Sequence, residues 1–167
     1  CIRDRGFHAE PPRTGRPIVA PADVALVVPP EKLVSRERIE AAVRALPAKR
    51  AGYPDAEQRD GLLKTQNDLI AALKALGYEP QLGDVNWAQR PKAGGEAPDP
   101  LPWKNIAVDI PGRDQPDEMY VFAAHFDAVP ASPGADDNGS GVAALLEMAR
   151  ILKDRPMKRT IRLIFFN

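Results

Sequence analysis

The side chains best suited to chemistry are His125, Asp127 and Asp137. His125 and Asp127 are two residues apart, and Asp137 follows ten residues later within the glycine-rich stretch PGADDNGSG. A histidine at the end of a strand can offer a ring nitrogen to a metal, and a carboxylate two residues on shares its face and can orient the ring. The adjacent carboxylates of Asp136 and Asp137 repel one another unless a cation or several donors hold them. The pattern therefore favours a metal site.

A second interpretation of the same residues is structural. Paired aspartates among glycine, asparagine and serine commonly form turns, and a histidine two residues before an aspartate often occurs by chance. The surrounding pattern decides between the two, because the histidine ends an apolar run and the aspartate loop leads into an apolar helix. We interpret Asp136 as a residue that shapes the loop rather than as a ligand.

Three elements must position these side chains. Residues 119–125 (MYVFAAH) are nearly all apolar and predict a central strand covered on both faces. A helical stripe starts at Gly141, and residues 160–166 (TIRLIFF) predict another buried strand. The order of strand, helix and strand along the chain indicates a parallel βαβ unit. Ligands gather at the carboxyl ends of strands in open α/β sheets, which is where His125 lies.

The remaining pattern extends this unit into a three-layer α/β/α domain with a mostly parallel central sheet, truncated at the end of the chain. We expect a loosely ordered, proline-rich arm at 1–22 and the N-terminal part of an α/β domain at 23–167. A short apolar run at 23–28 is not classified. Before the strand–helix–strand unit we expect two helices: one capped by Ser35 and stopped by Pro47, and one at 56–76 closed by Gly77. A strand at 78–87, a loop at 90–102 and a strand at 105–110 should follow them.

Composition excludes some classes of function. Lysine plus arginine and aspartate plus glutamate number 23 each, so no net field favours nucleic acid as a partner. No apolar run is long enough to predict a membrane span. The single cysteine is Cys1, which rules out a disulfide within the chain. A lipid anchor through Cys1, or a secreted or periplasmic location, is the favoured expectation, with an arbitrary chain boundary as the alternative.

Four stretches together resemble the zinc-dependent aminopeptidases of metallopeptidase family twenty-eight. They are AAHFDAVP, PGADDNGSG, VAALLEMARIL and TIRLIFFN, and the resemblance is dense from Asn105 to Asn167. It implies a hydrolase that uses metal-activated water to remove N-terminal residues from peptides. The complete site would hold two zinc ions, and no organic cofactor is implied.

The resemblance also assigns roles at matching positions. His125 would be a ligand to one zinc ion, Asp137 would bridge both, and Asp127 would be the catalytic-site carboxylate behind His125. The Asp137–Asn138 bond matches a place where the family tends to hold a cis peptide. The family's general base and remaining ligands follow the position of Asn167, so this chain would carry half of the site and show little activity alone. His8 is a weak further candidate ligand.

Other functions remain open at this point. Co-catalytic carboxypeptidases and deacylases also use His-x-Asp at a strand end, although DDNGSG fits them poorly. Glutaminyl cyclases share the fold. A non-catalytic scaffold or binding ectodomain is the alternative from a different class. We also expect self-association through an exposed apolar C-terminal strand, 160–166, because an unpaired edge favours pairing with another chain.

Overall fold

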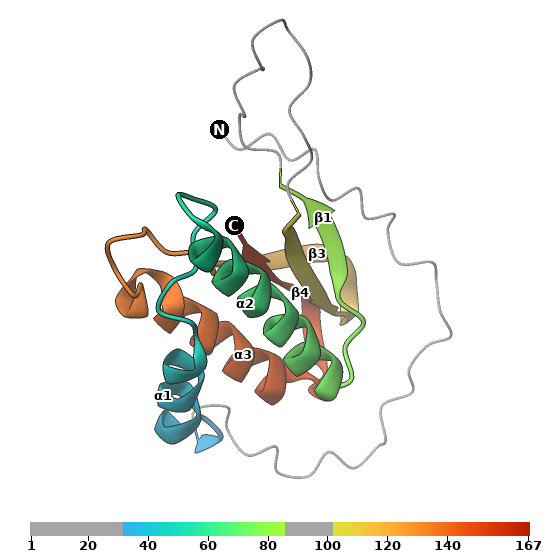
Figure 1. Ribbon diagram of the computed structural model, residues 1–167. Coiled ribbons are helices and arrows are strands. Elements are labelled where there is room, and N and C mark those ends of the chain that lie inside the picture. The colour runs from blue at the N-terminus through green and yellow to red at the C-terminus, as the bar shows by residue number, and fades with distance from the viewer. Residues whose placement is uncertain (1–31, 86–101) are drawn as a thin grey trace, which may run out of the picture.

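The computed structural model describes residues 32–85 and 102–167. The expected arm at 1–22, with Cys1 and His8, lies outside the described residues, as do the apolar run at 23–28 and nearly all of the expected loop at 90–102. Two helices, α1 and α2, are followed by two strands and then by a strand–helix–strand unit (Figure 1). Among the described residues, no helix is long and apolar enough to cross a membrane.

The first helix, α1 (Arg36–Ala45), begins where the sequence predicts. The Ser35 hydroxyl accepts a hydrogen bond from the Arg38 amide at 3.2 Å, which satisfies one of the free donors of the first turn. At the other end Leu46 takes an extended conformation before Pro47. The helix therefore stops one turn before the segment that contains Arg50.

The second helix, α2 (Ala56–Ala75), is also as predicted. Asp55 caps it by accepting a hydrogen bond from the Gln58 amide, and Gly77 closes it with a φ of +80°. Its buried stripe includes Leu62, Leu69 and Leu73, so that this face packs toward the sheet.

The sheet has four described strands in the order β1-β2-β4-β3. Strand β1 (Gln81–Asp84) is shorter than the 78–87 strand expected from the sequence, and it pairs antiparallel with β2 (Lys104–Ile110). Strand β2 pairs antiparallel with β4 (Met157–Phe166), and only β3 (Gly112–His125) and β4 pair in parallel. The α/β class is confirmed. The expectation of a mostly parallel sheet holds for one of the three described pairings.

The predicted strand–helix–strand unit is present. Strand β3 leads through a turn, η2 (Ala135–Gly139), into α3 (Ser140–Leu152), and β4 then returns beside β3. Figure 1 shows the three helices on one face of the sheet, so the described residues form two of the three expected layers. The core between them is apolar; it includes Leu62, Leu73, Ile106, Val108, Phe126, Val142, Leu163 and Phe165.

Two expectations about the sheet are wrong within the described residues. Strand β3 lies at an edge rather than at the centre, and its residues Met119, Tyr120, Val121 and Phe122 are exposed. The C-terminal strand β4 lies between β2 and β3 and is largely buried, so it is not the exposed edge. Apolarity predicted burial for both strands, but it carries no information about which of them has a neighbour on each side.

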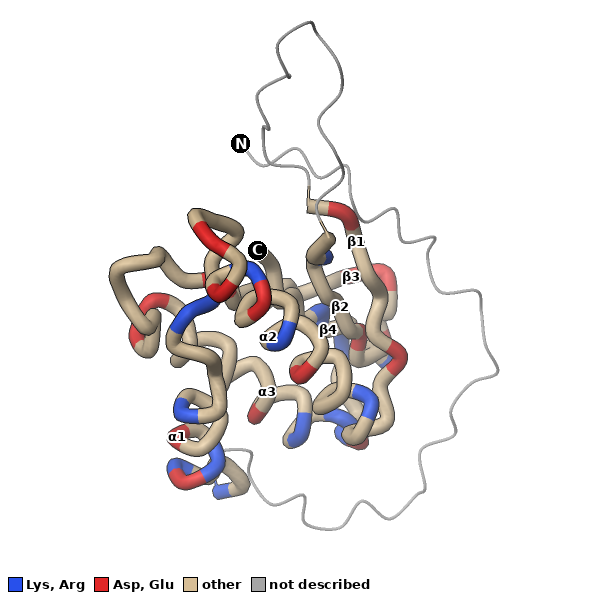
Figure 2. Tube along the Cα trace, viewed as in Figure 1, with Lys and Arg blue, Asp and Glu red and all other residues tan. Residues whose placement is uncertain are grey.

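Charged residues of both signs are spread along the described parts of the chain (Figure 2). One of them, Glu147 of α3, is buried, and it binds Arg38 of α1 and Arg150. Its carboxylate also accepts the amide hydrogen of Ser35. These hydrogen bonds lower the pKa of Glu147 from 4.5 to about 2, with the Arg38 contact as the largest cause. The group fastens α1 to α3.

Candidate metal site

His125 ends β3, at the carboxyl end of the parallel pair, opposite Phe166 of β4. Its Nδ1 lies 2.9 Å from Oδ1 of Asp127, as expected for residues two apart at a strand end. The Asp127 carboxylate can accept a hydrogen bond from Nδ1–H, which leaves the lone pair of Nε2 directed away from it. The ring of Phe166 lies 6.0 Å from the His125 ring and limits its movement on one side.

Asp137 reaches the other nitrogen of the same ring. Its Oδ1 lies 2.9 Å from His125 Nε2, and its side chain is 85% exposed. The backbone of η2 is not helical at Asp137 and Asn138, and the bond between them is cis, as the family resemblance implies. Gly134, with a φ of +56°, starts this turn, and the Gly139 amide closes it on the Gly134 carbonyl. The turn aims Asp137 back toward the end of β3.

The three predicted site residues therefore meet around one imidazole. When Nδ1 carries the proton toward Asp127, both Nε2 and the Asp137 carboxylate are acceptors, so a proton or a cation must lie between them. The Asp137 side chain is largely exposed, so its carboxylate could adjust to a cation held between the two groups. An imidazole and a carboxylate thus fit zinc as a partial set of ligands.

The set is incomplete within the described residues. They hold no group of three or more histidine, cysteine, aspartate or glutamate side chains arranged to bind one metal ion. Asp127 lies on the far nitrogen of the ring rather than beside Asp137. Asp136 contributes its main-chain carbonyl, which accepts the Ser140 hydroxyl, consistent with a role in shaping the loop.

Sequence reasoning missed one residue that contacts both parts of the site. Arg50 lies between α1 and α2 and is 1% exposed. Its guanidinium donates to the carbonyl oxygens of Phe126, Pro133 and Gly134, and also to Pro47. Burial lowers the pKa of Arg50, and the negative charge of Asp127 opposes this effect. No local motif marks Arg50, because its partners at the site, Phe126, Pro133 and Gly134, are 76 to 84 residues away.

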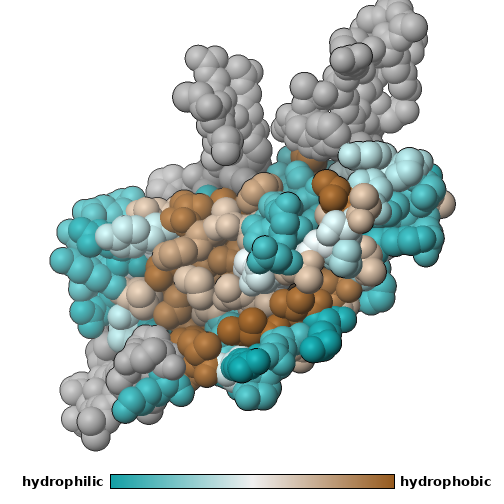
Figure 3. All heavy atoms as spheres, turned by 90° about the vertical axis from the view of Figure 1, so that its left-hand side faces the viewer, coloured by the Kyte–Doolittle hydropathy of each residue, from teal (hydrophilic) through white to brown (hydrophobic). Residues whose placement is uncertain are grey.

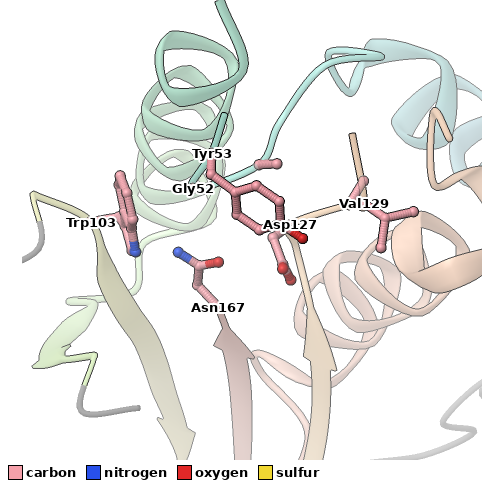
Figure 4. A pocket seen from close by; sticks show the side chains of 8 residues that line it. Gly52, Tyr53, Trp103, Asp127, Val129 and Asn167 are labelled. Atoms are coloured by element: carbon pink, nitrogen blue, oxygen red, sulfur yellow. The ribbon is translucent and has the colours of Figure 1, made fainter. Parts of the chain in front are cut away.

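A cavity of about 280 Å³ opens beside Asp127. Figure 4 shows Trp103 and Val129 at its two sides, with Tyr53 and Asn167 between them. Ala51, Gly52 and Ala128 complete the lining. The cavity gives aromatic and small apolar surface within reach of a carboxylate of the site.

The parallel strand β3 ends in His-x-Asp, and the aspartate turn that follows it at the start of α3 brings a carboxylate to the same imidazole. Residues 105–167 match the model of Peptidase family M28. The resemblance noted from the sequence is thereby confirmed for these residues.

Known proteins support the same assignment. The aminopeptidase YwaD of Bacillus subtilis is 59% identical over 51 residues, which are 30% of this chain and 11% of that protein. A probable zinc metalloprotease of Leptosphaeria maculans is 34% identical over 72 residues, 38% of this chain and 17% of that protein. The solved glutaminyl cyclase of Porphyromonas gingivalis aligns with a TM-score of 0.54 and 28% identity over 80% of this chain and 45% of that one.

The chain spans less than half the length of each of these proteins. The matching model is that of a peptidase family, and the Leptosphaeria maculans relative is named as a probable zinc metalloprotease. The number of metal ions, the residues that bind them and the activity of the whole protein are matters for proposal.

Proposed function

We propose that the protein is a zinc aminopeptidase in which His125 and Asp137 are metal ligands and Asp137 bridges two zinc ions. The observation that carries this proposal is the pair of contacts on one imidazole, with Asp127 at Nδ1 and Asp137 at Nε2, both at 2.9 Å. The family match covers all three residues. A non-catalytic scaffold would have no need to keep this arrangement.

The residues of this chain have separable tasks. When bound, zinc lowers the pKa of water and polarises a scissile carbonyl. Asp127 holds the proton of His125 on Nδ1 and so keeps the Nε2 lone pair available. The turn that contains Asp137 holds its carboxylate opposite Nε2. The cavity beside Asp127 could take an apolar or aromatic part of a peptide, because Tyr53, Trp103 and Val129 line it.

The proposal is tested by metal content and activity in the complete gene product. His125→Ala and Asp137→Asn should each lower zinc content, measured by elemental analysis after gel filtration, and abolish release of nitroaniline from aminoacyl-nitroanilides. Asp136→Asn is the matched control, because it removes an adjacent carboxylate for which no ligand role is proposed. Zinc content that is unchanged in both His125→Ala and Asp137→Asn would refute the assignment.

Cyclisation of N-terminal glutamine is a second candidate, favoured by the structural similarity to the Porphyromonas gingivalis glutaminyl cyclase over most of this chain. A glutaminyl-naphthylamide substrate separates the two reactions. An aminopeptidase releases naphthylamine and free glutamine, whereas a cyclase releases ammonia and leaves the amide to naphthylamine intact. Ammonia release without naphthylamine would replace the first proposal by the second.

A further inference from the structure

We propose that Arg50 is a positioning residue of the metal site, holding the strand end that carries His125 and the loop that carries Asp137 at a fixed separation. This inference rests on the proposed function, because it concerns the same site. The guanidinium of Arg50 binds main-chain carbonyls, so it acts through the two segments that carry the proposed ligands.

The contacts of Arg50 connect these two segments directly. Its Nε donates at 2.9 Å to the carbonyl of Phe126, the residue between His125 and Asp127. Its Nη2 donates at 2.7 Å to the carbonyl of Gly134, where the turn toward Asp137 begins. One planar, rigid group therefore spans the gap between both ligand-bearing segments.

Further contacts fix the position of Arg50 itself. The main-chain carbonyl of Arg50 accepts a hydrogen bond from the Ala128 amide at 2.9 Å. Both the main chain and the side chain of Arg50 therefore bind the segment that follows β3. Its Nη1 donates to Pro47 and Pro133, which ties the end of α1 to the loop. Four carbonyl oxygens thus receive hydrogen bonds from one guanidinium that is almost fully buried.

The chemistry of these partners explains why an arginine is required. A buried cation held by main-chain carbonyls must satisfy several acceptors lying in different directions, and a guanidinium has five donors in a fixed fork. A lysine keeps the charge but has three donors on a single nitrogen, too few for the four carbonyl oxygens that Arg50 binds. Arg50→Lys therefore weakens the bridge while preserving the sign of the charge.

The test compares Arg50→Lys with Arg162→Lys in the complete gene product. Arg162 is a matched control, because it is also largely buried and binds Asp109 with two hydrogen bonds at 2.7 Å, away from the site. In the metal-free protein we expect amide hydrogen exchange at 126–139 to become about 10- to 100-fold faster in Arg50→Lys only. Zinc affinity, measured by competition with a chromophoric chelator, should fall about 10- to 100-fold in the same variant.

The outcomes separate this inference from the proposed function. Equal exchange rates at 126–139 in the two variants, or unchanged zinc affinity despite a loosened loop, would overturn it. Loosening of the loop in a protein whose wild type binds no zinc would support the positioning of the loop by Arg50 and refute the proposed function. If Arg50→Lys fails to fold, amide hydrogen exchange is measured in the wild type instead. Amides of Ala128 and Gly139 that are protected as strongly as those of β4 would support the inference. Rapid exchange of these two amides would refute it.

Discussion

The carboxylate of Glu147 should stabilise the fold by joining α1 to α3, and replacing it by glutamine should show this. Glu147 is 7% exposed on its side chain and accepts hydrogen bonds from Arg38, Arg150 and the Ser35 amide. A pKa lowered from 4.5 to about 2 corresponds to about 3 kcal/mol if the unfolded chain has the ordinary value. Because Arg38 is about half exposed, solvent screens part of this, and we expect Glu147→Gln to cost about 1 to 2 kcal/mol.

The dependence on pH follows from the direction of the shift. The folded state holds Glu147 ionised more strongly than the unfolded state, so its contribution is fully present above pH 4.5 and is lost as the pH falls toward 2. The difference in unfolding free energy between wild type and Glu147→Gln should therefore be constant from pH 5 to 8 and shrink below pH 4.5. Urea denaturation followed by circular dichroism at several pH values measures it.

A control variant isolates the effect of burial. Glu40 also pairs with an arginine, Arg36, but both side chains are exposed. Glu40→Gln should change stability by less than about 0.5 kcal/mol at every pH. If Glu147→Gln behaves like Glu40→Gln at pH 7, or if its effect is unchanged at pH 2.5, the reasoning about the α1–α3 contact is refuted.

Three further predictions concern the site and its support. Asp127→Asn should lower zinc affinity about 10- to 100-fold by chelator competition, because the amide can present its NH₂ to His125 Nδ1 and disturb the tautomer; equal affinity would contradict this. Gly61→Ala should destabilise the protein by more than about 1 kcal/mol in urea, although alanine normally favours a helix, because its Cβ would overlap the Lys49 carbonyl; a stabilised variant would refute it. Val121→Lys, at the exposed β3 edge, should reduce self-association of the isolated 167-residue chain in light scattering, and a wild-type chain that is already monomeric would contradict the expectation.

Local sequence signals predicted the elements that depend on local chemistry. Ser35 caps α1, Gly77 ends α2, and an apolar stripe after Gly141 forms α3, because each signal lies within a few residues of its effect. The spacing of His125 and Asp127 likewise predicted their contact, since two residues at a strand end share a face. The contact with Asp137 followed from the family resemblance rather than from spacing.

The extent and place of β3 could not be predicted in this way. The strand starts at Gly112, well before the apolar run, and passes through polar residues with two irregularities in its pairing. The Thr160 hydroxyl bridges this irregular part, accepting the Gly112 amide hydrogen and donating to the Pro116 carbonyl. Such a long-range bridge leaves no periodic pattern, and the order of strands in a sheet leaves none either.

The position of Arg50 shows how the fold supports the site from outside its motifs. The family match begins at residue 105, whereas Arg50 is held by the packing of the preceding segment against α2. Gly61 costs α2 about 1 kcal/mol relative to alanine, yet only a glycine lets the Lys49 carbonyl approach the helix so closely. That approach sets the main chain of the next residue, Arg50, whose guanidinium then joins the carbonyls of Phe126 and Gly134. The His-x-Asp and aspartate-turn motifs supply the proposed metal ligands, and in this proposal a helical glycine distant in sequence helps to set the distance between them.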